Sequence, residues 1–253
     1  MTKVALVTGA RRGIGKAIAL ALAKEGYSIA AVDLSVTDEL EAMCGAVRSL
    51  GGKACAIAAN IAEISSHVPV LAATENALGP ITTLVNNAGV SVKSRGDLLD
   101  ITPDSYDLCQ DVNTRGTFFL SQAVAKRLLE RKTETHRSII TVTSANATAV
   151  SVTRGEYCIS KAGASMSSKL FAARLSNDGI GVYEIQPGFI ETDMTAPSKA
   201  RYDALIEDGL TVIKRFGKPE EVGRIAATLA LGLLPYTSGQ VIYADAGLLT
   251  VRY

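Results

Sequence analysis

Short runs of apolar residues recur along the chain, and polar segments with helical spacing separate them. Seven runs are almost continuously apolar, at residues 3–8, 28–33, 53–58, 81–85, 138–143, 180–185 and 239–244. This pattern is typical of strands that are buried on both faces of a parallel sheet. After the first run, Ile14, Ile18, Ala21 and Leu22 fall on one helical face, and Gly26 is a typical helix stop. The alternation of strand and helix therefore predicts a doubly wound α/β sheet.

The chain shows no proline- or serine-rich linker and no internal repeat, and 253 residues suit one large α/β domain. We predict a single Rossmann-like domain, residues 1–253, with about seven parallel strands and helices on both faces. Residues 191–216 depart from the compact pattern, because they carry Pro197 and the helix-like run ARYDALIEDGL between the last two strands. We interpret this segment as a substrate lid, and a surface excursion is the alternative.

The composition excludes several classes of protein. Lysine and arginine total 26 against 25 aspartates and glutamates, so a net charge of +1 argues against nucleic acid and membrane surfaces as partners. The longest apolar stretch, residues 225–234, is too short to span a bilayer, and we expect no signal peptide before the first strand. The four cysteines lack zinc-site spacing, and there are two histidines. We expect a cytoplasmic protein with reduced thiols and no metal.

The segment TGARRGIGKA, residues 8–17, has the composition of a phosphate-binding loop. A nucleoside-triphosphate loop requires G-x-x-x-x-G-K-[ST], but Ala10 stands at its first glycine and Ala17 at the hydroxyl residue that holds magnesium. Gly9 instead follows the first strand, and Gly13 and Gly15 open the first helix. Backbone N–H groups and the helix dipole attract a pyrophosphate at such a position. The loop therefore favours a dinucleotide, with an ordinary tight turn as the alternative.

Two side chains bear on which dinucleotide would bind. Asp33 ends the second predicted strand, where an acid can bind both hydroxyls of the adenosine ribose and would repel a 2′-phosphate. The guanidinium of Arg12 could instead meet a 2′-phosphate. Because like charges at contact distance repel strongly, Asp33 outweighs Arg12, and we predict that NAD(H) is favoured and that NADP(H) is the alternative.

Tyr157 and Lys161 lie four residues apart in EYCISKAG, so they share one face if this segment is helical. A free phenol titrates near pKa 10, and a neighbouring ammonium lowers that pKa by favouring the phenolate. Such a tyrosine can exchange a proton with an alcohol or a ketone near neutral pH. The pair is therefore a candidate acid/base site, although a surface Tyr/Lys pair would look the same in isolation.

Several motifs in order resemble the short-chain dehydrogenase/reductase family over essentially the whole chain. These are TGARRGIG in the glycine loop, NNAG at residues 86–89, Asn113, Ser144, YCISK, and PGFIETDMT at residues 187–195. Among its members, the motifs are closest to those of 3-oxoacyl-[acyl-carrier-protein] reductases. The resemblance implies an oxidoreductase that transfers hydride between a nicotinamide and a carbonyl or secondary alcohol.

The resemblance also implies a role for each catalytic residue. Tyr157 would be the general acid/base, Lys161 would lower its pKa and bind the nicotinamide ribose, Ser144 would hold the substrate oxygen, and Asn113 would anchor a water in a proton relay. The implied cofactor contacts are Gly9, Arg11, Arg12, Gly13, Ile14, Gly15, Asp33, Asn60, Ile61, Asn87, Ala88, Gly89, Tyr157, Lys161, Pro187, Gly188, Ile190 and Thr192.

The substrate is less closely defined, and an acyl thioester is one candidate. Related acyl-carrier reductases tend to carry an arginine for carrier docking near the position of Asp178, which here has the opposite charge. In the other docking region Arg131 and Lys132 are retained. They commonly use NADPH, and the closing DAG at residues 245–247 replaces their commoner glycine pair. A sugar, polyol or other small secondary alcohol is the alternative, and a non-catalytic dinucleotide-binding protein is a remote one. The family also implies a homotetramer, assembled through long helices expected at residues 103–130 and 154–176.

Overall fold

Parallel strands form one sheet at the centre of the computed structural model, which describes residues 2–131 and 133–252. Within these residues the sheet has seven strands, ordered β3-β2-β1-β4-β5-β6-β7. They are β1 (Lys3–Thr8), β2 (Tyr27–Asp33), β3 (Ala54–Ala58), β4 (Thr83–Asn86), β5 (Arg137–Val142), β6 (Ile180–Pro187) and β7 (Val241–Ala244). Each predicted run overlaps one strand, with ends that differ by up to two residues, so the predicted Rossmann-like α/β sheet is confirmed.

The strand order reverses at β1, which pairs with β2 on one side and with β4 on the other. Val7 of β1 is in register with Ala31 on β2 and with Val85 on β4. The chain therefore leaves the carboxyl ends of β1 and β4 in opposite directions. In doubly wound sheets a ligand binds in the crevice that this reversal opens.

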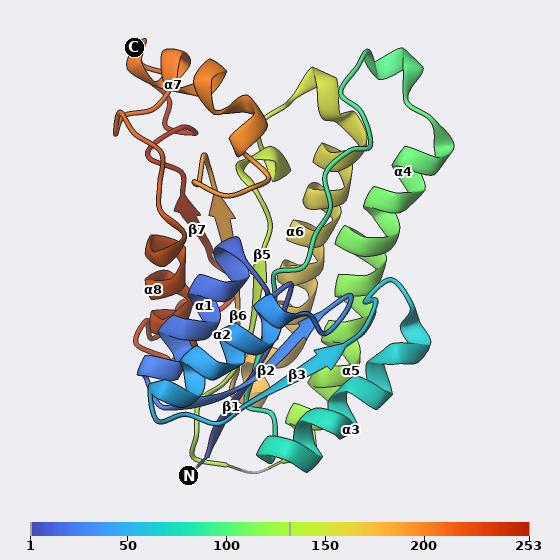
Figure 1. Ribbon diagram of the computed structural model, residues 1–253, viewed down its shortest axis with the longest axis vertical. Helices are drawn as coiled ribbons and strands as arrows, with labels where there is room; N and C mark the ends of the chain where they lie inside the picture. The colour runs from blue at the N-terminus through green and yellow to red at the C-terminus, as the bar shows by residue number, and fades with distance from the viewer. Residues whose placement is uncertain (1, 132, 253) are drawn as a thin grey trace.

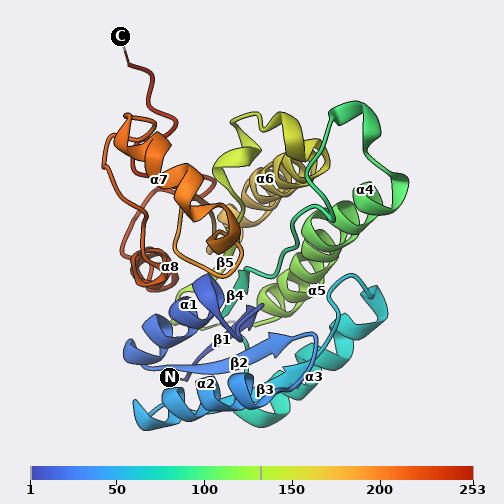
Figure 2. The ribbon, with the colours of Figure 1, turned by 45° about the horizontal axis from the view of Figure 1, so that its top comes forward.

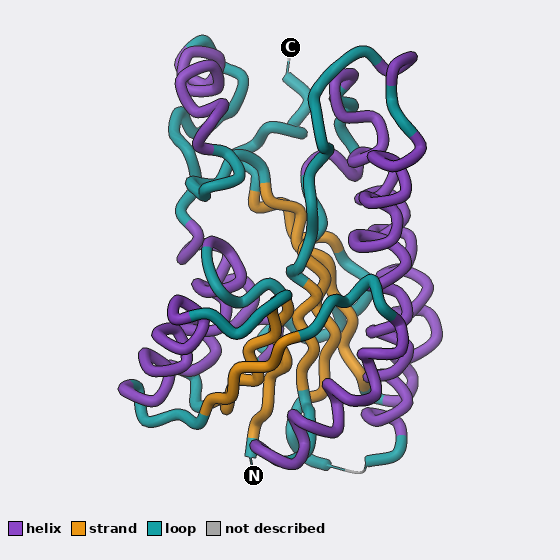
Figure 3. The backbone as a smooth tube through the Cα atoms, turned by 45° about the vertical axis from the view of Figure 1, so that its right-hand side comes forward, coloured by secondary structure: helices purple, strands orange, loops and turns teal. Residues whose placement is uncertain are grey.

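Helices cover both faces of the sheet (Figures 1 and 3). One face carries α1 (Gly13–Lys24), α2 (Asp38–Ser49) and α8 (Pro219–Ala230), and the other carries α3 (His67–Leu78), α5 (Thr117–Leu129) and α6 (Gly155–Leu175). α4 (Pro103–Cys109) continues the line of α5 beyond the strands. Short helical turns are η1 (Ile64–Ser66), η2 (Leu98–Asp100), η4 (Ala145–Ala147), η5 (Val152–Arg154), η6 (Ser176–Asp178) and η7 (Ala196–Ser198).

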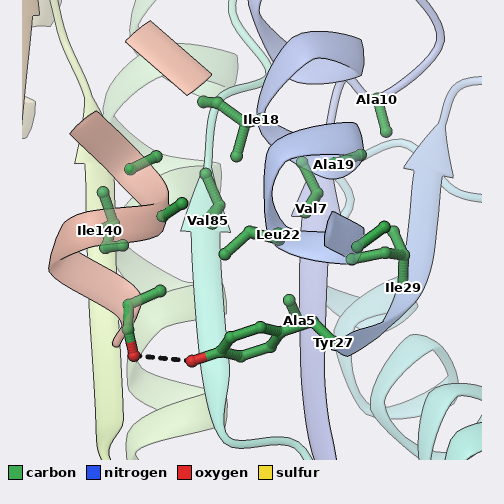
Figure 4. Close-up of a cluster of buried hydrophobic side chains, with 14 of the residues drawn as sticks. Ala5, Val7, Ala10, Ile18, Ala19, Leu22, Tyr27, Ile29, Val85 and Ile140 are labelled. Atoms are coloured by element: carbon green, nitrogen blue, oxygen red, sulfur yellow. Dashed lines mark hydrogen bonds between the residues drawn. The ribbon is translucent and has the colours of Figure 1, made fainter. Parts of the chain in front are cut away.

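The core between α1 and the sheet follows the hydrophobic pattern of the sequence. Ile18 and Leu22, on the predicted apolar face of α1, are completely buried against strand residues such as Val7 (Figure 4). Tyr27 lies in the same layer, and its hydroxyl donates to the carbonyl oxygen of Ala230 at 2.6 Å, which ties β2 to the end of α8. α1 is therefore held firmly, and its N-terminus stays fixed at the carboxyl edge of the sheet.

The long helix expected at 103–130 is divided. A π-helical segment, η3 (Gln110–Gly116), separates α4 from α5. This segment packs on α6, where Asn113 Nδ2 donates to Ser160 Oγ at 2.9 Å and Thr114 Oγ1 donates to the Ser160 carbonyl at 3.0 Å. π-helical turns insert a residue into a helix and often occur at functional sites. Hydrophobic spacing does not reveal such an insertion, because the apolar face continues on both sides of it.

The helix α7 (Lys199–Glu207) lies above the carboxyl ends of the strands and belongs to the predicted lid, residues 191–216. Figure 2 brings these ends forward, with α7 on one side, α4 on the other and α6 between them. The last described residues return to the same region, where Arg252 donates to the Gly209 carbonyl oxygen at 2.8 Å. The helices α7 and α6 thus lie beside the carboxyl ends of the strands at the switch point.

Candidate active site

The glycine turn packs tightly between β1 and α1. Gly9 and Gly13 have φ values of +64° and +55°, which side chains disfavour. A methyl group on Gly15 would lie 2.1 Å from the Gly9 carbonyl oxygen and 2.5 Å from Asn87 Nδ2. Among the described residues no side chain caps the N-terminus of α1, where Ile14 follows Gly13. The turn therefore fits a pyrophosphate, which needs close backbone approach and free N–H groups.

Asp33 faces this turn from the end of β2. Its carboxylate accepts from the backbone N–H of Arg11 at 3.3 Å and from that of Leu34 at 2.9 Å. The guanidinium groups of the loop pair elsewhere: Arg11 lies 3.6 Å from Glu39 and Arg12 lies 3.0 Å from Asp193. The negative charge of Asp33 is thus not neutralised by either arginine of the loop.

The segment after β4 is fixed to the glycine turn through Thr8. Its hydroxyl oxygen accepts from the N–H groups of Asn87 and Ala88, both at 3.0 Å. The Asn87 amide donates back to the carbonyl oxygens of Thr8 and Gly9, at 2.9 and 3.1 Å. These bonds join β1 to β4 at the switch point. The motifs TGARRGIG and NNAG therefore form one wall of the crevice, although they are far apart in sequence.

Tyr157 and Lys161 are both buried on one face of α6, as their spacing predicts. Lys161 Nζ donates to the Val142 carbonyl oxygen at 3.3 Å and lies 5.8 Å from the centroid of the Tyr157 ring. A methyl group on Gly89 would lie 3.2 Å from Lys161 Nζ and 3.1 Å from Asn113 Oδ1. The pair therefore reaches the crevice wall that NNAG forms.

Asn113 and Ser144 approach the pair from other elements. The Asn113 amide exchanges hydrogen bonds with the backbone of Val90, at 2.9 and 3.0 Å, and donates to Ser160. Ser144 follows β5 and forms a side-chain hydrogen bond with Tyr157. Asn113 and Lys161 both lie beside Gly89, and Ser144 and Lys161 both lie beside Tyr157, so the four residues expected to be catalytic are neighbours.

Burial is the main influence on the ionisation of Tyr157 and Lys161. It raises the pKa of Tyr157, against the lowering effects of the Ser144 hydrogen bond and of the Arg154 charge. It lowers the pKa of Lys161 to about 8, against the raising effect of Glu184. We expected Lys161 to be the cation that lowers the pKa of Tyr157, but the charge that lowers it is that of Arg154. The guanidinium of Arg154 is nearer, with Cζ at 5.1 Å from the ring centroid.

The segment after β6 closes the opposite side of the crevice. Pro187 ends the strand, and the N–H of Gly188 donates to the Ala244 carbonyl oxygen at 3.0 Å. A methyl group on Gly188 would lie 2.8 Å from Asp245 Cα, so the chain turns here without a side chain. Ile190 is buried, and Thr192 lies against Gly13, where a methyl group would come within 3.4 Å of its Cγ2.

The expected adenine contacts lie at the end of β3, beside β2. Asn60 is exposed and accepts from the N–H of Ala62 at 3.1 Å, whereas Ile61 is buried. The N–H of Ala59 donates to the Asp33 carbonyl oxygen at 2.8 Å, so Asn60 and Ile61 follow Asp33 closely in space. They stand away from Tyr157, at the end of the crevice where an adenosine would lie.

A groove of about 1220 Å³ runs along α1 between α2 and α8. It reaches Arg11, Arg12, Gly13 and Thr192. Neither Tyr157 nor Lys161 lines it, because both come from α6 on the other face of the sheet. The groove touches only the phosphate end of the crevice, so the site is defined by the converging side chains instead.

Arg154 lies beside Tyr157 and Glu184 acts on Lys161, and the sequence analysis identified neither residue. Arg154 stands three residues before Tyr157, a helical spacing that signals proximity, but the chain contains many such pairs. Glu184 is a buried acid in an apolar strand; it accepts from Thr143, from Ser165 at 2.8 Å and from Gln186 at 2.8 Å. An acidic residue within an apolar strand is unusual, and this feature of the sequence could have identified Glu184.

The switch-point crevice, its glycine turn and the buried Tyr/Lys pair are those of a dinucleotide-binding α/β oxidoreductase. Residues 9–249 match a model of the short-chain dehydrogenase/reductase family described as "Enoyl-(Acyl carrier protein) reductase". The chain therefore belongs to the short-chain dehydrogenase/reductase family. It is an NAD(P)-dependent oxidoreductase that acts on CH–OH groups or the corresponding carbonyls.

Known relatives are similar over almost the whole chain. A 3-oxoacyl-[acyl-carrier-protein] reductase of Thermotoga maritima is 35% identical over 248 residues, covering 97% of each chain. A 3-oxoacyl-[acyl-carrier protein] reductase of Brucella melitensis, solved in complex with NAD, is 43% identical, with a TM-score of 0.96 and coverage of 100% and 99%. A structure from Agrobacterium tumefaciens with bound NADP, provisionally named a 2-deoxy-D-gluconate 3-dehydrogenase, is 28% identical, with a TM-score of 0.86 and coverage of 98% and 97%.

These relatives bear on the cofactor. One solved structure holds NAD and another holds NADP, so a nicotinamide dinucleotide is the cofactor of this fold. None of the described helices combines the length and apolar character needed to cross a membrane.

Proposed function

We propose that the chain interconverts a ketone and a secondary alcohol with NAD(H), using Tyr157 as the general acid/base. The observation that carries this proposal is the convergence of Tyr157, Lys161, Ser144 and Asn113 beside the glycine turn. The bound nicotinamide would supply or accept the hydride at its C4 atom. The protein would contribute orientation and proton transfer.

Each side chain has a role that its environment supports. The phenol of Tyr157 donates its proton to the substrate oxygen during reduction and removes it during oxidation. Ser144, already hydrogen-bonded to Tyr157, holds that oxygen against the phenol. Lys161 binds the nicotinamide ribose. Asn113 holds the backbone of Val90 in place through two hydrogen bonds and anchors the water of a proton relay.

The residues of the site would hold the cofactor in the following order. The turn of Gly9, Arg11, Arg12, Gly13, Ile14 and Gly15 would bind the pyrophosphate. Asp33 would bind the adenosine ribose, Asn60 and Ile61 would flank the adenine, and Asn87 to Gly89 would pack along the cofactor. Pro187, Gly188, Ile190 and Thr192 would border the nicotinamide. The unneutralised charge of Asp33 makes NAD(H) the preferred form.

Two substrate classes fit this chemistry. The relatives named above favour a 3-oxoacyl thioester. A small secondary alcohol or sugar derivative is favoured by the expected carrier-docking region. There Arg131 is paired with Glu75 at 2.8 Å, and Asp178 is paired with Arg174 at 2.8 Å. Lys132, the other docking candidate, lies outside the described residues.

The test is turnover of a substrate panel by the parent protein and by Tyr157→Phe. The panel contains a short 3-oxoacyl thioester, several polyols and cyclic ketones, each with NAD(H) and NADP(H). Phenylalanine keeps the ring but cannot transfer a proton, so we expect a fall in kcat of at least about 100-fold with little change in NADH affinity. Unchanged turnover in this variant would remove Tyr157 from the mechanism. Cofactor binding without turnover of any substrate would favour the non-catalytic alternative.

We also propose a cytoplasmic homotetramer. Three apolar side chains on one side of α6 are at least half exposed: Ile159, Met166 and Leu170. Another copy of the chain would cover such an exposed apolar face. Light scattering on the purified protein tests the assembly. A monomer at micromolar concentration would contradict it.

A further inference from the structure

Arg154, the last residue of η5, holds its guanidinium against the ring of Tyr157. The Arg154 Cζ atom lies 5.1 Å from the ring centroid, and Nη2 donates to Asn146 Oδ1. The Nε atom is buried, and it has no hydrogen-bond partner in the described part of the chain. No carboxylate within residues 2–131 and 133–252 forms an ion pair with Arg154.

Two cations of the segment after β4 already have partners. Lys93 Nζ lies 3.9 Å from Asp104, and Arg95 donates to the Tyr202 hydroxyl at 3.5 Å. A half-buried charge without a counter-ion is costly, because it has lost water without gaining an anion. Arg154 therefore differs from both of these side chains in leaving part of its hydrogen-bonding capacity unused.

The position of Arg154 is fixed relative to the reacting groups. Asn146, which accepts from the guanidinium, donates its own N–H to Ser144 Oγ at 3.1 Å and its side-chain amide to the Ala149 carbonyl oxygen at 3.0 Å. Arg154 thus contacts Tyr157 directly and Ser144 through a single residue. A ligand oxygen held by Tyr157 and Ser144 would have this guanidinium as a close neighbour.

We propose that Arg154 binds a carboxylate of the substrate, so that the chain acts on a small oxo acid or hydroxy acid. The planar fork of a guanidinium matches a carboxylate and can donate two hydrogen bonds to it. A thioester or a neutral polyol would leave Nε buried and unpaired. This inference rests on the carbonyl chemistry proposed above, and it narrows the class of small secondary alcohols to those that carry a carboxylate.

The test compares acids with their neutral counterparts. Initial rates with NADH are measured for 2-oxobutanoate, 3-oxobutanoate and 4-oxopentanoate, for the methyl ester of each, and for the N-acetylcysteamine thioester of 3-oxobutanoate. The three chain lengths vary the distance between carbonyl and carboxylate. The parent protein is compared with Arg154→Gln, with Arg154→Lys and with Lys93→Gln. Lys93→Gln is the matched control, because it removes a cation of the same region that already has a partner.

We expect at least one acid to exceed its own ester in kcat/KM in the parent protein. Arg154→Gln should lower kcat/KM for that acid by about 30-fold, the effect of losing a charged hydrogen-bonded pair, and change the ester much less. Arg154→Lys should retain part of the preference, and Lys93→Gln should retain all of it. A loss of rate that is equal for acid and ester would mean that Arg154 acts only on Tyr157 and would overturn the proposal.

Esters or the thioester that match or exceed every acid in the parent protein would also overturn the proposal. That comparison stands even if the Arg154 variants do not fold. If the parent protein turns over no substrate, the proposed function fails separately. Binding of 3-oxobutanoate and of its methyl ester to the NADH complex of Tyr157→Phe, followed by NADH fluorescence, then tests Arg154. The proposal is supported if 3-oxobutanoate binds more tightly than its methyl ester and if adding Arg154→Gln abolishes this difference. Equal binding of the acid and the ester overturns the proposal.

Discussion

The ammonium of Lys161 lies 5.8 Å from the centroid of the Tyr157 ring, and both groups are buried on the same side of α6. Burial favours the neutral form of each, so it raises the pKa of the phenol and lowers that of the ammonium. Near neutral pH the lysine is still mainly charged and the tyrosine holds its proton. This is the protonation state that the reduction of a carbonyl requires.

Lys161 should make stability depend on pH. Its pKa of about 8 in the folded protein is below the ordinary value of 10.5, so between these values the unfolded chain binds more protons. Lys161 by itself should therefore raise the free energy of unfolding between pH 8 and pH 10, by at most about 3 kcal/mol. Cys44 and Cys109 oppose this contribution above pH 9, because burial raises the pKa of each thiol from 9.0 to about 11, so the effect of Lys161 is the difference between the parent protein and its variant. Below pH 8 both states are protonated and the destabilisation is complete. Urea unfolding of the parent protein and of Lys161→Met across this range measures the effect.

Lys161→Met should lose this rise, because methionine has no proton to release. Lys169→Met is the control, since Lys169 is exposed on the same helix and its loss should leave the pH dependence unchanged. An equal rise in the Lys161→Met variant would show that the dependence has another source.

Asp33 should control the choice between NADH and NADPH. Its carboxylate is held by the N–H groups of Arg11 and Leu34 at the end of β2, where it would face a 2′-phosphate. Asp33→Asn keeps the size and removes the charge, so we expect the preference for NADH to fall by about tenfold, which corresponds to 1.4 kcal/mol. Fluorescence titration with both reduced cofactors measures the change.

Glu39→Gln is a matched control, because it removes a nearby carboxylate that pairs with Arg11 but lies on α2. Tighter binding of NADPH than of NADH by the parent protein would mean that the arginines of the loop outweigh Asp33.

Gly15→Ala should disrupt the glycine turn. The added methyl group would lie 2.1 Å from the Gly9 carbonyl oxygen, which belongs to the backbone and cannot move aside. We expect a loss of about 2–4 kcal/mol in the free energy of unfolding, together with weaker NADH binding. Urea unfolding and cofactor titration measure both effects.

Gly45→Ala provides the comparison within another helix. A methyl group there meets nothing within 4 Å, and alanine favours the helix, so the variant should be more stable by about 0.5–1 kcal/mol. Equal effects of the two substitutions would show that the close approach at Gly15 is unimportant.

Tyr202 should hold the overhanging segment 191–216 in place. Its ring lies 4.3 Å from that of Phe189, and its hydroxyl accepts from Arg95 across the crevice. If this segment is a substrate lid, Tyr202→Ala should raise KM for the substrate by roughly tenfold and leave NADH affinity nearly unchanged. Steady-state kinetics and fluorescence titration separate the two effects.

Tyr202→Phe keeps the ring contact and tests the hydroxyl separately. A KM that is unchanged in Tyr202→Ala would favour the alternative, in which residues 191–216 are only a surface excursion.

The sequence by itself determined the strands, the class of fold and the family. Continuous apolar runs specify buried parallel strands locally, and the motifs TGARRGIG and NNAG both follow such runs. Parallel strands bring their carboxyl ends to one edge, so the motifs had to lie at that edge. The spacing of Tyr157 and Lys161 likewise fixed their common face, since helical periodicity is a local property.

Only the tertiary structure decided which groups act on these residues. Asn113 lies in a π-helical turn that packs on α6, and Glu184 lies on β6 near Lys161. Arg154 meets Tyr157 and Asn146 only after η5 turns into α6. These relationships depend on burial and on contacts between separate elements, which for Asn113 and Glu184 are also distant in sequence. They set the direction of each pKa and leave one guanidinium for a ligand, and periodicity along the chain carries no record of either.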